Sequence, residues 1–302
     1  SASVFTSNRC KANPVLWSQE VVKDGVVRAV VLNSGGANCY TGAEGFQTTH
    51  AVAEQVAANL GIGAIDVVVC STGLIGVPND RGQLLAGVDA LSAALSSEGG
   101  LDAATAIMTT DTVPKQSVVQ RDGWSIGAMA KGAGMLAPAL ATMLVVITTD
   151  ADIDAETADR ALRASTRVSF DRLDSDGCMS TNDTVTLLAS GASGVQPTAA
   201  EFTDALQAVC VDLAKQLLAD AEGADHEISI VVRNAATEDD AVEVGRSVAR
   251  NNLFKAAVFG KDPNWGRVLA GVGTTSAVFD PANLDVGLNG VWVCRTSEPA
   301  ED

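Results

Sequence analysis

The residue in this sequence best suited to nucleophilic chemistry is Thr142, which follows Ala141 at the start of an apolar run. If the bond between Ala141 and Thr142 were cut, Thr142 would carry both a hydroxyl group and a free α-amine. An α-amine has a pKa of about 8, so near neutral pH it can accept the proton of the hydroxyl. Nucleophile and general base would then lie on one residue. Threonine is also a common strand residue, and the pattern alone leaves that alternative open.

The segment before Thr142 is unusual for the approach to a strand. Lys131 to Gly134 (Lys-Gly-Ala-Gly) predicts a glycine-rich loop, which leads through Pro138 to a predicted buried strand at 143–147. Strain in such a backbone could assist an N-to-O acyl shift. Lys131 could hold a substrate carboxylate as a point charge, although a solvated loop lysine would give the same pattern.

Two further turns could bind an anion. Thr72 and Gly73 follow a predicted strand at 65–70. A hydroxyl and a backbone N–H at that point could converge on an oxyanion, and an ordinary strand-to-loop turn is the alternative. The segment 33–38 (Asn-Ser-Gly-Gly-Ala-Asn) could also cradle an anion, but it lacks the G-x-G-x-x-G spacing of a dinucleotide site.

Two polar positions remain as candidate substrate contacts. Glu222 follows the clearest predicted helix, 198–219, beside a predicted helix end at Gly223. A carboxylate is unfavourable at a helix C-terminus, which indicates another role, such as binding a substrate ammonium group. The run 109–112 (Thr-Thr-Asp-Thr) is the other polar cluster, and a capped turn would explain it equally well.

Composition excludes several classes of protein. The net charge of −17 argues against nucleic acid or an anionic membrane as a partner. We expect no membrane span, because no long uninterrupted apolar run is present, and the N-terminus lacks the apolar core of a signal peptide. Six scattered cysteines without a C-x-x-C pair predict reduced thiols in the cytoplasm and no metal site. Neither His50 nor His226 adjoins a nucleophile motif, so a Ser-His-Asp triad is not indicated.

The apolar pattern predicts strands that alternate with helices, and therefore a mixed α/β architecture in packed layers. Strands are expected at 27–33, 65–70, 143–147, 184–189, 228–232 and 256–259, with a hairpin across 121–123 and a strand-like tail to 294. Helices are expected near 52–60, 84–95, 152–167, 198–219 and 237–251. The sequence contains no linker, low-complexity stretch or internal repeat, which predicts one compact unit of one or two lobes.

Together these motifs resemble the ornithine acetyltransferases, also called bifunctional glutamate N-acetyltransferases, of arginine biosynthesis. The run 131–144, which contains Ala141 and Thr142, is similar to the self-cleavage motif of that family. Further similar stretches follow in the family's order at 4–9, 32–38, 71–76, 107–115, 180–184, 222–224 and 260–267. Leu140 stands where methionine is frequent in the family. The chain begins after the family's usual N-terminal segment and ends before its C-terminal Asn…Thr/Ser contact segment.

The resemblance implies a layered α/β (α+β) sandwich of the type shared by self-cleaving ornithine acetyltransferases and aminopeptidases. It implies cleavage between Ala141 and Thr142 into an α chain, 1–141, and a β chain, 142–302, assembled as α2β2 or larger. Thr142 would take the acetyl group from N-acetylornithine and pass it to glutamate by a ping-pong route through an acetyl-enzyme.

The resemblance also assigns roles to individual positions. Thr72 and Gly73 match the family's oxyanion hole. Its substrate contacts match Thr109, Lys131, Thr142 and Glu222. No cofactor is implied, and the sequence does not decide whether acetyl-CoA also serves as an acetyl donor.

Two other functions remain open at this point. A self-cleaving aminopeptidase or amidohydrolase of the same fold would differ in using water, and not an amine, as the acyl acceptor. Lys131 and Glu222 favour a small amino-acid substrate over a peptide. A non-enzymatic α/β domain that binds a metabolite would require Thr142 to be an ordinary core residue, and would give a single band on a denaturing gel.

Overall fold

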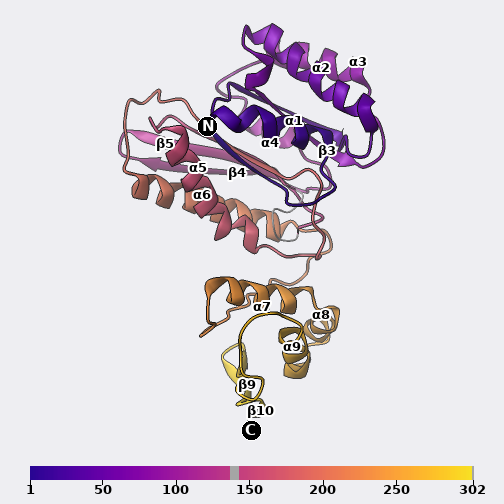
Figure 1. Cartoon of the computed structure of the whole chain (residues 1–302), viewed down its shortest axis with the longest axis vertical. Helices are drawn as coiled ribbons and strands as arrows, with labels where there is room; N and C mark the ends of the chain where they lie inside the picture. The colour runs from indigo at the N-terminus through magenta and orange to yellow at the C-terminus, as the bar shows by residue number, and fades with distance from the viewer. Residues whose placement is uncertain (137–142, 301–302) are drawn as a thin grey trace. The chain divides into compact units, whose positions relative to one another are not determined.

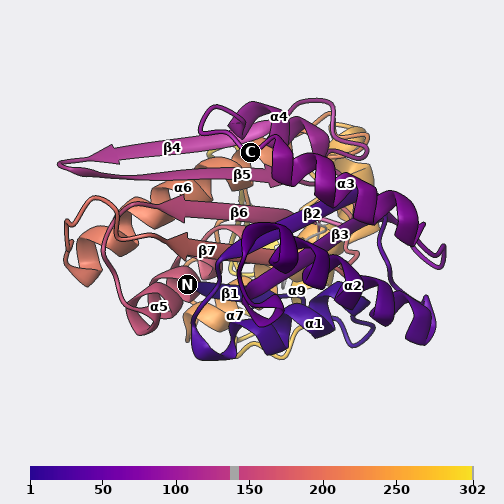
Figure 2. The ribbon, with the colours of Figure 1, turned by 90° about the horizontal axis from the view of Figure 1, so that it is seen from above.

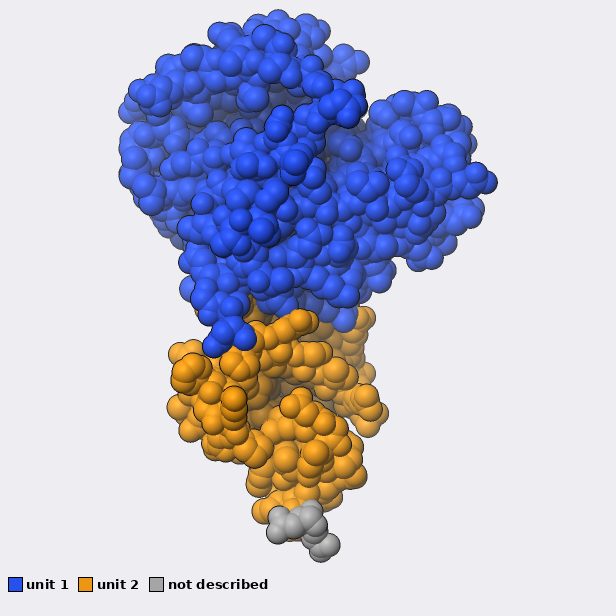
Figure 3. Space-filling view, turned by 180° about the vertical axis from the view of Figure 1, so that it is seen from behind, with its two compact units in different colours: residues 1–173, 178–225 blue, residues 174–177, 226–302 orange. Residues whose placement is uncertain are grey.

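The computed structural model describes residues 1–136 and 143–300. The chain divides into two compact units, which Figure 3 colours separately: residues 1–173 with 178–225, and residues 174–177 with 226–302. This division groups residues that contact one another within each unit. The 1–141 and 142–302 portions, in contrast, are defined by a predicted cleavage point within the first unit.

The first unit is built on a sheet in which the described strands have the order β1-β7-β6-β5-β4 (Figure 2). Its strands are β1 (Ala2–Phe5), β4 (Lys115–Arg121), β5 (Trp124–Lys131), β6 (Leu144–Thr149) and β7 (Thr184–Ala189). β6 and β7 are parallel, and the other neighbours are antiparallel. The predicted hairpin across 121–123 and the predicted strand at 184–189 are confirmed. The predicted strand at 143–147 begins one residue later and continues to Thr149.

Two helices, α5 (Ala155–Arg167) and α6 (Ala199–Ala219), pack side by side and cover one face of this sheet (Figure 1). Both were predicted. A capping box between Thr198 and Glu201 begins α6 by satisfying free N–H groups of its first turn. Its apolar stripe is fully buried: Phe202, Leu206, Val209, Leu213 and Leu217. Burying a side chain of this size contributes about 1.5–3 kcal/mol, so α6 is a main support of the sheet.

The opposite face of the large sheet packs against a parallel pair, β2 (Ala29–Gly36) and β3 (Val67–Leu74). Val68 and Cys70 on β3 share an apolar cluster with Leu144 on β6. The outer face of the pair is covered by apolar residues of α2 and α3. The layers are therefore α5 with α6, the large sheet, the β2–β3 pair, and α2 with α3. The predicted layered α/β sandwich is confirmed.

The helices of this half are α1 (Asn13–Val21), α2 (Gly42–Leu60), α3 (Arg81–Ala93) and α4 (Gly100–Ala106). Short 3₁₀ helices are η1 (Val22–Asp24), η2 (Ala64–Asp66) and, further along the chain, η3 (Phe170–Arg172). The predicted helix near 52–60 is confirmed as α2, which ends before Gly61. The helix predicted near 84–95 is α3, but it ends at Ala93 and leaves Leu95 exposed.

The strands β2 and β3 are longer than predicted, because their ladder continues through both glycine turns. Gly35 pairs with Gly73, and Gly36 pairs with Leu74. Gly73 has φ +123°, and a Cβ atom there would lie 2.4 Å from the carbonyl carbon of Gly35. Only glycine allows this close approach. The prediction that the two strands end before Ser34 and Ser71 is therefore wrong, because 34–36 belong to β2 and 71–74 to β3.

The second unit contains three helices and a small sheet among its described residues. These are α7 (Glu238–Arg250), α8 (Asn252–Phe259), α9 (Trp265–Val272), β8 (Val286–Leu288), β9 (Val291–Arg295) and β10 (Glu298–Pro299). The helix predicted at 237–251 and the strand-like tail are confirmed. The strand predicted at 256–259 is wrong, because these residues form the second half of α8. The strand predicted at 228–232 is also wrong, although Ile230 does pack against the apolar cluster of this unit.

Over the two described ranges of the chain, no helix is both long enough and apolar enough to cross a membrane.

Candidate active site

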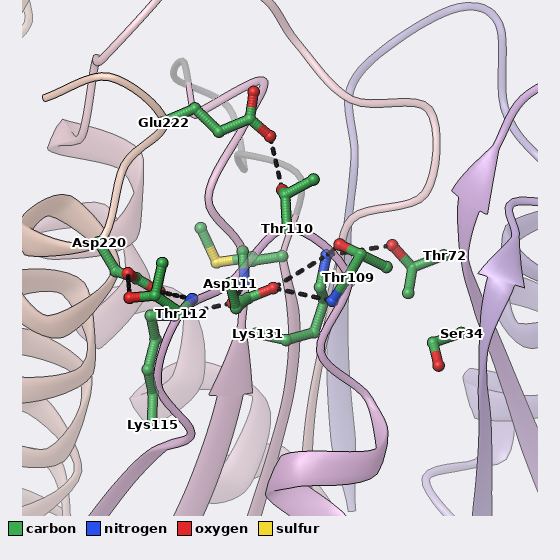
Figure 4. A network of polar contacts seen from close by, with 12 residues as sticks. Ser34, Thr72, Thr109, Thr110, Asp111, Thr112, Lys115, Lys131, Asp220 and Glu222 are labelled. Carbon is green, nitrogen blue, oxygen red and sulfur yellow. Dashed lines mark hydrogen bonds and ion pairs between the residues drawn. The ribbon is translucent and has the colours of Figure 1, made fainter.

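Three of the predicted site residues meet at the end of β5. Lys131 is the last residue of that strand and is only 1% exposed. Its Nζ donates hydrogen bonds to Thr109 Oγ1 at 2.8 Å and to Thr72 Oγ1 at 3.2 Å (Figure 4). Lys131 is therefore not a solvated loop lysine. The structure brings its ammonium group together with two predicted threonines that are far apart in sequence.

The register of the strands explains why these residues converge. Thr72 lies near the end of β3, where it pairs with Ser34 of β2. Lys131 pairs with Leu144, the first residue of β6. Leu144 comes two residues after Thr142 in the sequence. The buried ammonium group is thus placed beside the strand that the predicted nucleophile precedes.

Ala141 and Thr142 themselves lie outside the described residues. The chain immediately after them is fixed by a residue that the sequence analysis did not single out. Met143 donates its backbone N–H to Asp183 Oδ1 at 3.0 Å, and Asp183 is fully buried just before β7. Burial raises the pKa of Asp183 well above its usual value, while the hydrogen bond from Met143 partly opposes that effect.

A second missed residue, Asp111, connects Lys131 to its surroundings. Its Oδ1 accepts hydrogen bonds from Lys115 Nζ at 2.7 Å and from the N–H of Gly132 at 2.6 Å. Its Oδ2 accepts from the N–H of Thr109 at 3.1 Å and lies 3.7 Å from Lys131 Nζ. The run 109–112 was noted for its polarity, but a capped turn does not describe it. Asp111 is instead a buried carboxylate that joins the 109–115 segment to Gly132 through hydrogen bonds.

Lys115, the third missed residue, is fully buried and lies between two carboxylates. Besides Asp111, its Nζ donates to Asp220 Oδ2 at 2.6 Å. Asp220 also accepts a hydrogen bond from the backbone N–H of Thr112 at 2.9 Å. Asp220 occupies the C-cap of α6, where a carboxylate is unfavourable unless a cation compensates it. Lys115 supplies that cation.

The pKa values in this cluster follow from burial opposed by neighbouring charge. Burial lowers the pKa of Lys131, and the carboxylate of Asp111 opposes that change. Burial alone would raise the pKa of Asp111, but Lys115, the N–H of Gly132 and the charge of Lys131 together bring it below its usual value. Asp111 is therefore ionised at neutral pH.

Glu222 follows α6 within a turn, as expected from the predicted helix at 198–219. The C-cap of α6 is Asp220, however, so the predicted helix end at Gly223 is wrong. Its side chain is exposed, and its Oε1 accepts a hydrogen bond from Thr110 Oγ1 at 2.5 Å. A Cβ atom on Gly134 would lie 2.8 Å from that same oxygen. Glu222 is thus an exposed carboxylate close to Gly134 of the glycine-rich segment. It contacts Thr110, which follows Thr109 in the sequence (Figure 4).

Comparison with known proteins identifies this class of layered α/β protein. The model of the ArgJ family matches residues 1–302. A protein from Streptomyces coelicolor named arginine biosynthesis bifunctional protein ArgJ is 64% identical over 302 residues, which are all of this chain and 79% of that protein. A protein of the same name from Thermobifida fusca is 61% identical, again over all of this chain and 79% of its own length. The chain belongs to the ArgJ family.

One solved structure is similar to part of the chain. It is described as ornithine acetyltransferase complexed with ornithine, from Mycobacterium tuberculosis. The sequence identity is 51%, the match covers 48% of this chain and 77% of the other, and the TM-score is 0.45.

Family membership confirms the class of enzyme that the resemblance implied. The protein is an acetyltransferase of arginine biosynthesis, a glutamate N-acetyltransferase of the ornithine acetyltransferase type that acts on small molecules. The hydrolase and the non-enzymatic binding domain are not favoured.

Proposed function

We propose that this protein cleaves itself between Ala141 and Thr142 and then transfers an acetyl group from N-acetylornithine to glutamate through an acetyl-enzyme on Thr142. The main support is the buried ammonium group of Lys131. It contacts Thr72 and Thr109 and lies beside the strand that begins two residues after Thr142. A cation held in this way can bind an anionic substrate next to the nucleophile.

In the proposed cleavage, Thr142 Oγ attacks the carbonyl carbon of Ala141 and the bond from that carbon to the Thr142 nitrogen breaks. The acyl group moves to the hydroxyl oxygen as an ester, and water then hydrolyses the ester. The products are a carboxylate on Ala141 and a free α-amine on Thr142. This amine is the base that activates the hydroxyl in the transfer reaction.

In the proposed transfer, Thr142 Oγ attacks the acetyl carbonyl of N-acetylornithine. The carbon–nitrogen bond breaks, and ornithine leaves with a proton on its amine. The amine of glutamate then attacks the acetyl ester, which gives N-acetylglutamate and restores the hydroxyl. We assign Thr72 and Gly73 to stabilising the oxyanion of both tetrahedral intermediates.

The charges around the site fit the two substrates. Both carry an α-carboxylate, and we assign its binding to Lys131 with help from Thr109. N-acetylornithine also carries a side-chain ammonium group, and we assign its binding to the exposed carboxylate of Glu222. A charge-assisted hydrogen bond of this kind contributes about 1.5–3 kcal/mol.

The remaining parts of the proposal concern assembly, donor and location. We propose that the two cleaved chains assemble as an α2β2 heterotetramer in the cytoplasm. The transfer requires no cofactor, and acetyl-CoA is a candidate second acetyl donor. Gel filtration of the cleaved protein tests the proposed assembly. An assay with acetyl-CoA in place of N-acetylornithine tests the proposed second donor.

The self-cleavage itself is tested by a denaturing gel of the purified protein. We expect two fragments of similar size in place of a 302-residue chain. N-terminal sequencing of the second fragment should read Thr-Met-Leu-Val, which begins at Thr142. A single full-length band, or a fragment that begins elsewhere, would contradict the proposed function.

The role of Glu222 can be tested by Glu222→Gln, which keeps the hydrogen bond from Thr110 available but removes the charge. We expect the variant to cleave itself normally and its KM for N-acetylornithine to rise about 10- to 150-fold, while kcat largely survives. The reason is that an ammonium contact made equally in the ground and transition states contributes uniform binding. Glu98→Gln, at another exposed carboxylate, serves as control. An unchanged KM would remove Glu222 from the substrate site.

A further inference from the structure

Four charged residues form a row of alternating sign beneath the proposed site. In order along the row they are Asp220, Lys115, Asp111 and Lys131 (Figure 4). Three of the side chains are at most 1% exposed, and Asp220 is 8% exposed. The row contains two cations and two anions, so its formal charges cancel. The two lysines, however, differ in how closely they contact the carboxylates.

Lys115 has closer carboxylate contacts than Lys131 has. Lys115 Nζ lies 2.6 Å from Asp220 and 2.7 Å from Asp111, so it has two close ion pairs. Lys131 Nζ is 3.7 Å from the nearest oxygen of Asp111, which is beyond hydrogen-bond distance. Its hydrogen bonds go to the neutral hydroxyls of Thr72 and Thr109.

The carboxylate of Asp111 is held away from Lys131 by its other partners. Oδ1 is occupied by Lys115 and by the N–H of Gly132, and Oδ2 by the N–H of Thr109. Asp111 is therefore near enough to favour the charged form of Lys131 but does not neutralise it by direct contact. In a buried environment a charge that is not neutralised attracts an incoming anion far more strongly than it would in water.

We propose that Asp111 and Lys115 are positioning residues that set the charge of Lys131. Asp111 keeps the buried ammonium protonated and anchors the backbone at Gly132, which follows Lys131, and at Thr109, whose hydroxyl contacts the ammonium. Lys115 keeps Asp111 from pairing directly with Lys131, so that the ammonium remains available to the carboxylate of the substrate. This inference rests on the proposed function, since it takes Lys131 as the group that binds that carboxylate.

Asp111 and Lys115 act in opposite directions on the pKa of Lys131, so the proposal predicts opposite shifts when each is replaced. Burial lowers the pKa of Lys131, Asp111 and Asp183 raise it, and Lys115 lowers it. Binding of an anion to Lys131 should weaken as pH rises through this pKa, because the ammonium loses its charge. Removing Asp111's charge should move that loss to lower pH, and removing Lys115's charge should move it to higher pH.

The ligand for the test is N-acetylnorvaline, the analogue of N-acetylornithine without the side-chain amine. From about pH 6 to about pH 10 this ligand stays an anion, so a change in its Kd reports on the protein. The first variant is Asp111→Asn. The second is Lys115→Gln combined with Asp220→Asn, which removes one cation and one anion and leaves the net charge unchanged.

We expect the pH at which binding weakens to fall by about one unit in Asp111→Asn and to rise in the double variant. One unit corresponds to about a tenfold change in Kd at a fixed pH above the midpoint. Shifts in the same direction, or no shift in either, would overturn the proposal. If Asp111→Asn fails to fold, the double variant decides alone, because it removes a buried cation together with a carboxylate that it pairs with. An upward shift then supports the proposal, and any other result overturns it.

Lys131→Met separates this inference from the proposed function. If Lys131 binds the carboxylate, the variant should bind N-acetylnorvaline about 10- to 150-fold more weakly and lose the part of the pH dependence that Lys131 contributes. Wild-type binding by Lys131→Met would overturn both the assignment of Lys131 and the present inference. Weak binding by Lys131→Met together with unshifted profiles in the other variants would overturn the present inference alone.

Discussion

Replacing Thr142 with alanine is expected to leave one uncut chain without acetyl transfer. The proposed cleavage and the acetyl-enzyme both need the same hydroxyl group, so a single substitution should abolish two separable events. The measurements are a denaturing gel and an assay of ornithine release from N-acetylornithine. The variant should still fold, because the hydrogen bond from the Met143 N–H to Asp183 fixes the start of β6 and is unaffected by the substitution.

Two further substitutions bracket this result. Thr142→Ser retains a hydroxyl and should retain partial cleavage. Thr148→Ala removes an exposed threonine hydroxyl from β6 itself and should behave as the wild type. Finding the alanine variant cut between residues 141 and 142 would exclude Thr142 as the processing nucleophile.

Replacing Thr72 with valine is expected to lower kcat by about 10²- to 10³-fold, with little change in KM for N-acetylornithine. The loss of one donor to an oxyanion typically raises the barrier by about 2.7–4 kcal/mol. Thr72 is 2% exposed, and valine matches its shape within β3, so the change removes the hydroxyl without opening a cavity. Steady-state kinetics on cleaved protein, with a melting curve for each variant, measure the effect.

Thr72→Ser is the matched variant because it keeps the hydroxyl and loses only a methyl group. Its kcat should stay much closer to that of the wild type. If valine and serine at this position gave equal kcat values, the hydroxyl of Thr72 would have no part in the chemistry. Its contact with Lys131 would then serve only to hold the lysine in place.

The sequence indicated the contacts of the candidate site that depend on local pattern, but it did not indicate those that depend on pairing across the chain. Lys131 and Thr72 each stand in a distinctive glycine-rich run, and the family resemblance added Thr109. The bond between Lys115 and Asp220 joins residues 105 positions apart, and neither residue lies in a motif that suggests a partner. A buried ion pair of this kind becomes visible only when the strands and α6 have been placed.

The errors in secondary structure have a similar cause. The run 256–259 is apolar and short, so its pattern fits a strand or part of a helix equally well. The deciding feature is Asn251, whose side chain accepts hydrogen bonds from the N–H groups of Leu253 and Phe254 and so begins α8. Residues 228–232 alternate as a strand would, but among the residues that the structure describes no strand pairs with them, and one apolar face on its own does not make a sheet.

The strand order has a consequence for the protein after cleavage. β6 and β7 follow the proposed cut, while their outer neighbours, β5 and β1, precede it. The two fragments would therefore interleave within one sheet, joined by backbone hydrogen bonds along both seams. Neither could leave without exposing the apolar core beneath α5 and α6. Self-cleavage would turn a unimolecular fold into an obligate two-chain complex, whose melting temperature rises with protein concentration and whose refolding requires the two fragments to meet.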